Sequence, residues 1–338
     1  MRRNLILSMV VVGLLFGFVP DAEAASWTAG GANDRWDNPA NWNPDVPGSG
    51  DFAVFTDAIN PQVAEIDSGT AAVAARVLLG DNEATDDSTL NQTGGTFNVA
   101  GEFNVGWKGK GTFNLTDGTA TVGSRFSIGG GAGYSAGFGT ATVNGAGAIL
   151  NVGTNITMGL GVGGTSSVTQ QLNLIQGTIT ADDLYVGDAT GINARVDMTG
   201  GTMTFGDLGI ITNAGAGSPV TGHFQLDGGI VNVTNATTFP QTGGGIAVGF
   251  RIRTDAGQNG SFDITGGTLI LEGDAVATID GYVGSGHLTG YGGAGTISRS
   301  FDGSNTTVTA IPEPGSLTLA ALGLLSLVAC GRRRRDKR

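Results

Sequence analysis

Short segments in which apolar and polar residues alternate recur along the chain, and glycine-rich stretches separate them. Alternation with a period of two is typical of β-strands that bury one face. One recurring segment ends in a hydrophobic residue followed by Gly. Its copies are RVLLG (76–80), EFNVG (102–106), RFSIG (125–129), NITMG (155–159), DLYVG (183–187), DLGII (207–211), GIAVG (245–249) and DGYVG (280–284). The copies end 23 to 38 residues apart, and Ile211 replaces the Gly in the sixth copy.

Two further strand-like segments precede most of these copies. One is seen in GTFNL (111–115), GHFQL (222–226) and GSFDI (260–264), and the other in TGGTFNV (93–99), TDGTATV (116–122), IQGTITA (175–181), TGGTMTF (199–205), DGGIVNV (227–233) and TGGTLIL (265–271). Three short strands per repeat predict one coil of a parallel β-solenoid, with Val, Ile, Leu and Phe inside and Thr, Asn and Ser outside. Insertions after the third strand, such as 129–139 and 159–167, are expected to form loops at one corner.

We therefore predict an all-β fold, a right-handed parallel β-helix or solenoid of about eight coils over residues 62–310. An antiparallel β-sandwich is the alternative, because it also contains many short strands and turns. No convincing helix signal occurs in residues 25–310. Glycine makes up 61 of the 338 residues, which suits corners where the backbone turns sharply or approaches another segment closely.

The N-terminal residues have the three parts of a secretory signal. Arg2 and Arg3 are followed by an apolar stretch from Leu5 to Val19 and then by Ala22-Glu23-Ala24, a small-x-small cleavage pattern. We predict a helical signal peptide over residues 1–24 and an exported chain that starts at Ala25. An uncleaved N-terminal membrane anchor is the alternative.

The C-terminal residues 311–338 contain another ordered set of features. Pro312-Glu313-Pro314 precedes an apolar run of 14 residues, Leu317 to Cys330, and the basic cluster Arg332 to Arg335. Fourteen residues are few for a permanent membrane span, which needs about 20. A sorting signal is therefore favoured over a structural anchor.

This tail resembles the PEP-CTERM sorting signal of Gram-negative bacteria. The resemblance implies recognition by an exosortase-like peptidase, transient insertion into the inner membrane through a C-terminal hydrophobic helix, and a final location at the cell surface or in the exopolysaccharide matrix. Extracellular polysaccharide is then an expected partner. Whether the tail is cleaved is left open by the sequence.

Charge narrows the choice of partners. Residues 25–310 contain 9 Lys and Arg against 25 Asp and Glu, a formal charge of −16. Such a body repels nucleic acid and anionic lipid, so neither is an expected partner. Cys330 is the only cysteine, so no disulfide can form within the body.

Three tryptophans precede the repeats, in residues 25–61. Trp27, Trp36 and Trp42, followed by Pro47, Asp51 and Phe55, resemble the lead-in of exported proteins with autotransporter-associated β-strand repeats. The tryptophans are expected to cap the open end of the solenoid, which would otherwise expose strand edges. A glycan-stacking platform is the second interpretation, which would make the protein a carbohydrate-binding module.

Catalytic signals are weak. Asp182-Asp183, Gly222-His223 and Arg251-Ile252-Arg253 are similar in order to motifs of polygalacturonases, but a third carboxylate is missing and His223 is followed by Phe224. Two carboxylates must face one cleft for glycoside hydrolysis, whereas neighbours on a strand point to opposite sides. We predict no catalysis and no cofactor, with a polysaccharide-degrading enzyme as the third hypothesis.

Metal-binding signals are also weak. The body contains His223 and His287 but no cysteine, so a structural zinc site is not expected. The loop 80–88 gathers the carboxylates that a calcium ion would need, Asp81, Glu83, Asp86 and Asp87. It lacks the EF-hand pattern, so a solvated turn is the preferred interpretation and calcium binding stays open.

Overall fold

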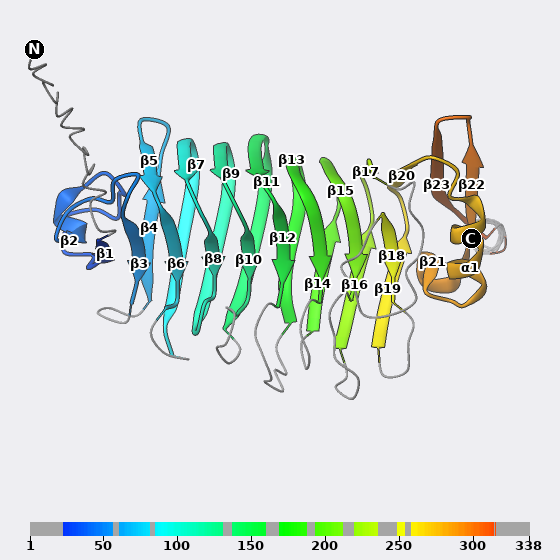
Figure 1. Ribbon diagram of the computed structural model, residues 1–338, viewed down its shortest axis with the longest axis horizontal. Coiled ribbons are helices and arrows are strands. Elements are labelled where there is room, and N and C mark those ends of the chain that lie inside the picture. The colour runs from blue at the N-terminus through cyan, green and yellow to red at the C-terminus, as the bar shows by residue number, and fades with distance from the viewer. Residues whose placement is uncertain are drawn as a thin grey trace, which may run out of the picture.

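Repeated alternation of inward apolar and outward polar residues winds the chain into a parallel β-solenoid of about eight turns, seen as an elongated rod in the computed structural model (Figure 1). The structure describes residues 23–56, 61–81, 85–130, 137–159, 169–187, 193–211, 220–235, 249–253, 258–313 and 315. Successive coils pair in parallel, which confirms the solenoid and not the antiparallel sandwich. The right-handed sense stays a prediction.

Each coil contributes to three parallel sheets, which we call faces one, two and three in chain order. Face one consists of β4 (Gln62–Ile66), β14 (Asn193–Met198), β16 (Val220–Leu226), β19 (Gln258–Ile264), β21 (Leu288–Gly290) and the first parts of β7 (Asp87–Val99), β9 (Lys110–Val122), β11 (Phe138–Val152) and β13 (Thr169–Val186). Face two consists of β5 (Ala71–Ala74), β17 (Ile230–Val233), β20 (Thr268–Glu272), the later parts of β7, β9, β11 and β13, and the start of β15 (Thr202–Ile210).

Face three contains the third strand of each coil, at the position of the hydrophobic-Gly repeat. Its members are β1 (Ala24–Trp27), β3 (Phe52–Phe55), β6 (Arg76–Leu79), β8 (Phe103–Val105), β10 (Phe126–Ile128), β12 (Asn155–Met158), β18 (Phe250–Ile252) and the ends of β13 and β15. The last apolar residues of the copies stack in register as Leu79, Val105, Ile128, Met158, Val186, Ile210 and Ile252, all buried. The predicted three-strand unit is therefore correct.

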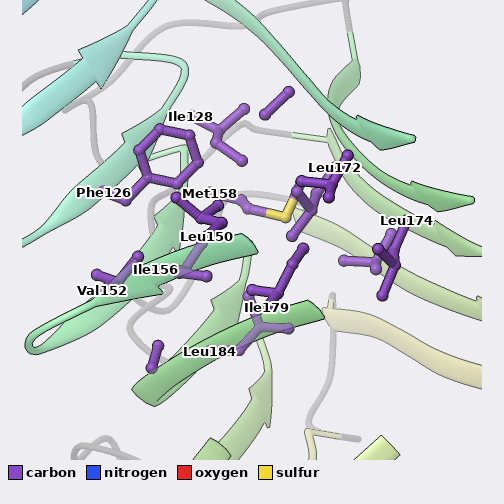
Figure 2. Close-up of a cluster of buried hydrophobic side chains, with 14 of the residues drawn as sticks. Phe126, Ile128, Leu150, Val152, Ile156, Met158, Leu172, Leu174, Ile179 and Leu184 are labelled. Carbon is purple, nitrogen blue, oxygen red and sulfur yellow. The ribbon is translucent and has the colours of Figure 1, made fainter. Parts of the chain in front are cut away.

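The interior is filled by side chains from all three faces. Near the first coils Phe97, Phe103, Phe113 and Phe126 form a chain of ring contacts with centroids 5.0–6.4 Å apart. In the middle of the rod aliphatic residues take over, as Figure 2 shows around Met158, Leu172 and Ile179. Full burial of each such side chain contributes about 1.5–3 kcal/mol, which is how a chain without disulfides holds its coils together.

Two of the eight predicted repeat copies are placed wrongly. The repeat pattern predicts that GIAVG (245–249) pairs with DLGII, but the strand that pairs with Leu208–Ile210 is β18, four residues further on. DGYVG (280–284) is not a strand, because it forms the end of helix α1 (Val276–Gly284). The expectation of a body without helices is therefore wrong at this point. At the end of a stack a strand would expose a new edge, and α1 covers the last coil instead.

Both ends of the rod carry additional elements. At the N-terminal end β2 (Trp42–Asn43) and the short 3-10 helix η1 (Pro39–Asn41) follow β1. At the C-terminal end η2 (Tyr291–Gly293) leads into a hairpin of β22 (Gly295–Phe301) and β23 (Asn305–Pro312), and β23 pairs antiparallel with β20. Figure 1 shows this hairpin standing at the end of the stack next to α1.

Several predictions concern residues outside the described ones. These are the signal segment up to Ala22, residues 131–136 of the predicted loop 129–139, residues 160–167 of the predicted loop 159–167, the apolar run Leu317 to Cys330 and the basic cluster after it. Among the residues that the structure describes, no helix has the length and apolar character needed to cross a membrane.

Candidate functional site

The sorting tripeptide begins where the solenoid ends. Pro312 is the last residue of β23 and lies opposite Gly295 of β22, while Glu313 follows it as an exposed residue. Ile311 is 53% exposed, although Ile311 and Pro312 still pair with Thr296 and Gly295 of β22. Pro314 lies outside the described residues. The segment is thus presented at the rim of the last coil and not enclosed by it.

The predicted signal cleavage site falls at the start of the described chain. Ala24 and Ala25 begin β1 and pair with Phe52 and Ala53 of β3. The Phe52 N–H also donates to the Glu23 carbonyl oxygen, at 2.8 Å. Cleavage after Ala24 would therefore leave a mature chain that begins inside β1, and this boundary stays a prediction.

The tryptophan cluster closes the N-terminal end of the core. Trp27, Trp36 and Trp42 are 0%, 1% and 4% exposed. Trp42 lies edge-on against both other indoles, with ring centroids 5.0 Å and 4.8 Å apart, and Trp27 stacks on Phe55 at 5.5 Å. The Trp42 Nε1–H donates to the Trp36 carbonyl oxygen at 2.7 Å.

This burial does not favour the glycan-stacking interpretation of the three tryptophans, which stays a prediction. A sugar ring needs an exposed aromatic face, whereas these rings are covered by one another and by the first coil. The cap is held to that coil by Arg35, which forms ion pairs with Asp37 and Asp67. The cluster therefore has the position and burial of an end cap.

The residues that suggested hydrolase chemistry are divided between two faces, with His223 on face one and both Asp183 and Arg251 on face three. Asp183 lies on face three, opposite Asp207 of the next coil, and His223 lies on face one, where its Nδ1 is 2.8 Å from Ser261 Oγ. Arg251 belongs to β18 and is buried on face three. His223 and Asp183 consequently do not face a common cleft.

The structure does place two carboxylates next to each other on face three. Asp183 accepts a hydrogen bond from the Tyr185 hydroxyl at 2.8 Å, and Asp207 accepts from the Gly249 N–H at 2.7 Å and from Asn235 Nδ2 at 3.0 Å. Burial raises the pKa of Asp183, the Tyr185 hydrogen bond lowers it, and Asp207 and Asp182 raise it further. The equivalent repeat position of both residues is the sequence signal for this pair.

The same column of face three carries alternating charges nearer the N-terminus. Glu102 forms ion pairs with Arg76 on one side, at 2.8 Å, and with Arg125 on the other. The Arg76 guanidinium also lies 4.8 Å from the centre of the Trp107 ring. This column is thus an ordinary structural ladder in its first half.

The proposed calcium loop has cationic neighbours. Asp81 lies 3.8 Å from Lys108 Nζ and Asp87 lies 2.7 Å from Lys110 Nζ, while Asp86 is buried and Glu83 lies outside the described residues. Burial raises the pKa of Asp81, and Lys108 lowers it. Within the described ranges, no group of three or more His, Cys, Asp or Glu side chains is arranged to hold a metal ion.

Comparison with known proteins identifies the tail. Residues 310–335 match the PEP-CTERM protein-sorting motif. Neither the curated proteins nor the solved structures contain a match to the chain. The motif implies an exported protein that an exosortase sorts to the cell envelope or surface. The likeness of the tryptophan segment to autotransporter-associated repeats stays a prediction.

Proposed function

We propose that this protein is a non-catalytic, exosortase-sorted structural and adhesive rod of the cell surface or exopolysaccharide matrix of a Gram-negative bacterium. The observation that carries the proposal is the position of the sorting motif, which begins at the last strand of a capped solenoid. A rod of this kind holds its polar faces at a fixed spacing, because each coil is bonded to its neighbours along the whole length.

The surface chemistry supports an extracellular role. The body between Ala25 and Ala310 is strongly acidic and has no cysteine, so it does not depend on a redox environment and repels nucleic acid. Of the side chains that suggested an enzyme, His223 lies on face one, whereas Asp183 and Arg251 lie on face three, and this separation supports a role without catalysis. Extracellular polysaccharide is the expected partner.

In this proposal the C-terminal tail directs the protein to the cell surface. The apolar run from Leu317 to Cys330 inserts transiently into the inner membrane, and Arg332 to Arg335 stay on its cytoplasmic side. An exosortase-like peptidase then recognises Pro312-Glu313-Pro314 at the rim of the last coil and releases or transfers the rod.

The test is the intact mass of the protein recovered from cells and from the culture matrix. We expect matrix material that starts near Ala25 and ends near Pro312-Glu313-Pro314. A variant with this tripeptide replaced by three alanines should keep its C-terminal mass and stay with the membrane fraction. Matrix material that still ends at Arg338 would contradict processing.

Catalysis is tested separately. The purified chain is incubated with neutral and acidic polysaccharides, and new reducing ends and unsaturated products are measured. We expect none above the level of the Asp183→Ala variant. Release of products by the original chain and not by the variant would establish the enzyme hypothesis instead.

A further inference from the structure

Face two presents two columns of uncharged side chains, most of them Thr or Asn. Both columns are exposed or half-exposed, and each runs across seven coils. Column A contains Thr96, Thr119, Ile149, Thr178, Thr202, Ile230 and Thr268, and column B contains Asn98, Thr121, Asn151, Thr180, Thr204, Asn232 and Ile270. Neighbours within a column are about 4.8 Å apart, and the columns are about 6.7 Å apart, since they come from positions i and i+2 of each strand.

Hydrogen bonding distinguishes this face from face one. On face one the outward side chains bind one another from coil to coil, for example Asn114 to Asn91 at 2.9 Å and Gln225 to Asp263 at 3.1 Å. Among the described side chains of columns A and B, a single such bond occurs, from Asn232 Nδ2 to Thr204 Oγ1 at 3.4 Å. The hydroxyl and amide groups of face two are thus available to a ligand.

Charge distinguishes face two from the rest of the body. The two columns contain no ionisable residue, although residues 25–310 have a formal charge of −16. Face one, in contrast, carries ion pairs such as Arg195 with Asp197 and Lys110 with Asp87. A ligand of face two is therefore selected by hydrogen bonding and shape and not by charge, and an acidic polymer is disfavoured by the surrounding carboxylates.

A pocket of about 630 Å³ lies at the C-terminal end of column B. It forms where β23 continues the sheet beyond β20, with Asn305 opposite Glu272. Its polar lining comes from Thr204, Asn232, Thr234, Glu272, Ser304 and Asn305. Glu272 is exposed, and its carboxylate can accept hydrogen bonds from two neighbouring hydroxyls of one ligand.

Apolar groups are interspersed among these polar ones. Ile149 and Ile230 are 37% and 41% exposed in column A, and Ile270 lines the pocket. A sugar ring has hydroxyls around its edge and C–H groups on its faces, so a surface that alternates hydroxyl, amide and short aliphatic groups matches both parts. This combination favours a glycan over a peptide strand, because the sheet edges are not exposed along the columns.

We propose that face two binds a neutral polysaccharide along the rod axis, with one sugar unit seated in the pocket next to Glu272. The proposal rests on the matrix role above and names the site and the class of polymer. Each coil adds a weak contact, and the regular spacing allows many contacts to form with the same chain, so affinity increases with glycan length.

The test uses the full chain and a soluble neutral β-glucan, with polygalacturonate as the acidic comparison. Thr180→Val with Thr204→Val removes two hydroxyls from column B and keeps the side-chain shape. Glu272→Gln removes the pocket charge. Thr112→Val is the matched control, since Thr112 occupies an outward position on face one of β9.

We expect the neutral glucan to bind with little salt dependence and more tightly as its length increases. The double Thr variant should weaken binding about tenfold, because each lost hydrogen bond reduces affinity a few-fold. Glu272→Gln should also weaken it, whereas Thr112→Val should not. Equal binding of polygalacturonate, no binding of the neutral glucan, or equal losses in the control would overturn the inference.

The outcome is separable from that of the proposed function. Binding is measured on purified protein, whereas sorting is measured by the mass and location of the chain in cells. Correct processing without glucan binding refutes the site alone. Glucan binding by a chain that stays in the membrane refutes the proposed route and leaves the site in place.

Discussion

Gly106 stands at a corner where the backbone passes very close to the neighbouring coil. Its φ is +78°, and a Cβ atom at this position would lie 2.0 Å from the Phe138 carbonyl oxygen. Gly303, in the turn of the C-terminal hairpin, also has a positive φ, +103°, but an added Cβ there meets nothing within 4 Å. The pair separates the effect of conformation from that of close contact.

We expect Gly106→Ala to lower the free energy of unfolding by about 3 kcal/mol or more, because strain and steric overlap act together. Gly303→Ala should cost about 1–2 kcal/mol, the conformational part alone. Chemical denaturation followed by circular dichroism measures both. Equal losses would show that the coil moves aside at Gly106 without cost.

The carboxyl group of Asp183 makes the stability of the fold depend on pH. Burial is the main cause of its raised pKa, with Asp207 and Asp182 adding to it. A carboxyl whose pKa is higher in the folded than in the unfolded state binds more protons when folded. Its contribution to the free energy of unfolding therefore decreases as the pH rises from the ordinary carboxyl pKa of the unfolded state through the raised pKa of the folded state.

The Asp183→Asn variant should remove this loss and be more stable than the original chain at neutral pH. Asp302→Asn is the control of opposite sign. Backbone N–H groups of Asn305 and Ser304 lower the pKa of Asp302. The contribution of Asp302 to the free energy of unfolding is therefore lost as the pH falls. Melting temperatures from pH 3 to 8 would test both, and parallel curves for all three chains would contradict the assignment.

At the scale of elements, helix α1 occupies the position next to β18 where another strand of face three would otherwise pair. The Ile252 N–H of β18 donates to the Tyr282 hydroxyl oxygen at 3.0 Å, and the Tyr282 ring lies edge-on against Phe250 at 5.8 Å. Burial raises the pKa of the Tyr282 hydroxyl, and the Ile252 hydrogen bond lowers it. The helix thus satisfies a strand-edge donor that another coil would otherwise bind.

Tyr282→Phe should cost about 1–3 kcal/mol, because it leaves the Ile252 N–H without its partner in a part-buried position. Hydrogen exchange should accelerate in β18 and β19 and not in the first coils, since each coil of a repeat protein contacts its neighbours alone. Tyr282→Leu, which also removes the ring contact with Phe250, should have the larger effect. Uniform acceleration along the rod would contradict a local capping role.

The strand predicted from the local sequence pattern at 280–284 was wrong for a physical reason. The segment from Val276 to Gly284 is rich in β-branched residues and glycine, so its own propensity favours a strand. It forms a helix because the stack ends there and Ile279 and Tyr282 pack on the last coil. Register failed at β18 because this strand ends in Ile252-Arg253 without a Gly, whereas Val248-Gly249 just before it has the expected ending.

At the scale of the whole molecule, stacked apolar columns run through the described coils, and we expect stability to depend on them and not on bound ions. Asp81 and Asp87 already have lysine neighbours, and the described residues contain no group arranged for a metal. We expect excess EDTA to leave the melting temperature unchanged. A decrease that added calcium reverses would show that the loop 80–88 is a calcium site.

The sequence alone determined the features that follow from local repetition. The period of two along each segment and the recurring hydrophobic-Gly ending predicted three strands per coil and about eight coils, and the tail motif predicted sorting. These signals are local because side chains alternate on every strand and because a sorting signal is read as an extended segment.

The tertiary structure decided what happens where the repeat stops. A tryptophan in the sequence can be either exposed or buried. Only the packing in the structure showed that Trp27, Trp36 and Trp42 close the core. The helix at the other end depends on a strand edge supplied by distant residues. Likewise, the pocket next to Glu272 exists because β23, folding back from the end of the chain, pairs with β20. Such features arise from contacts between segments, which no local pattern encodes.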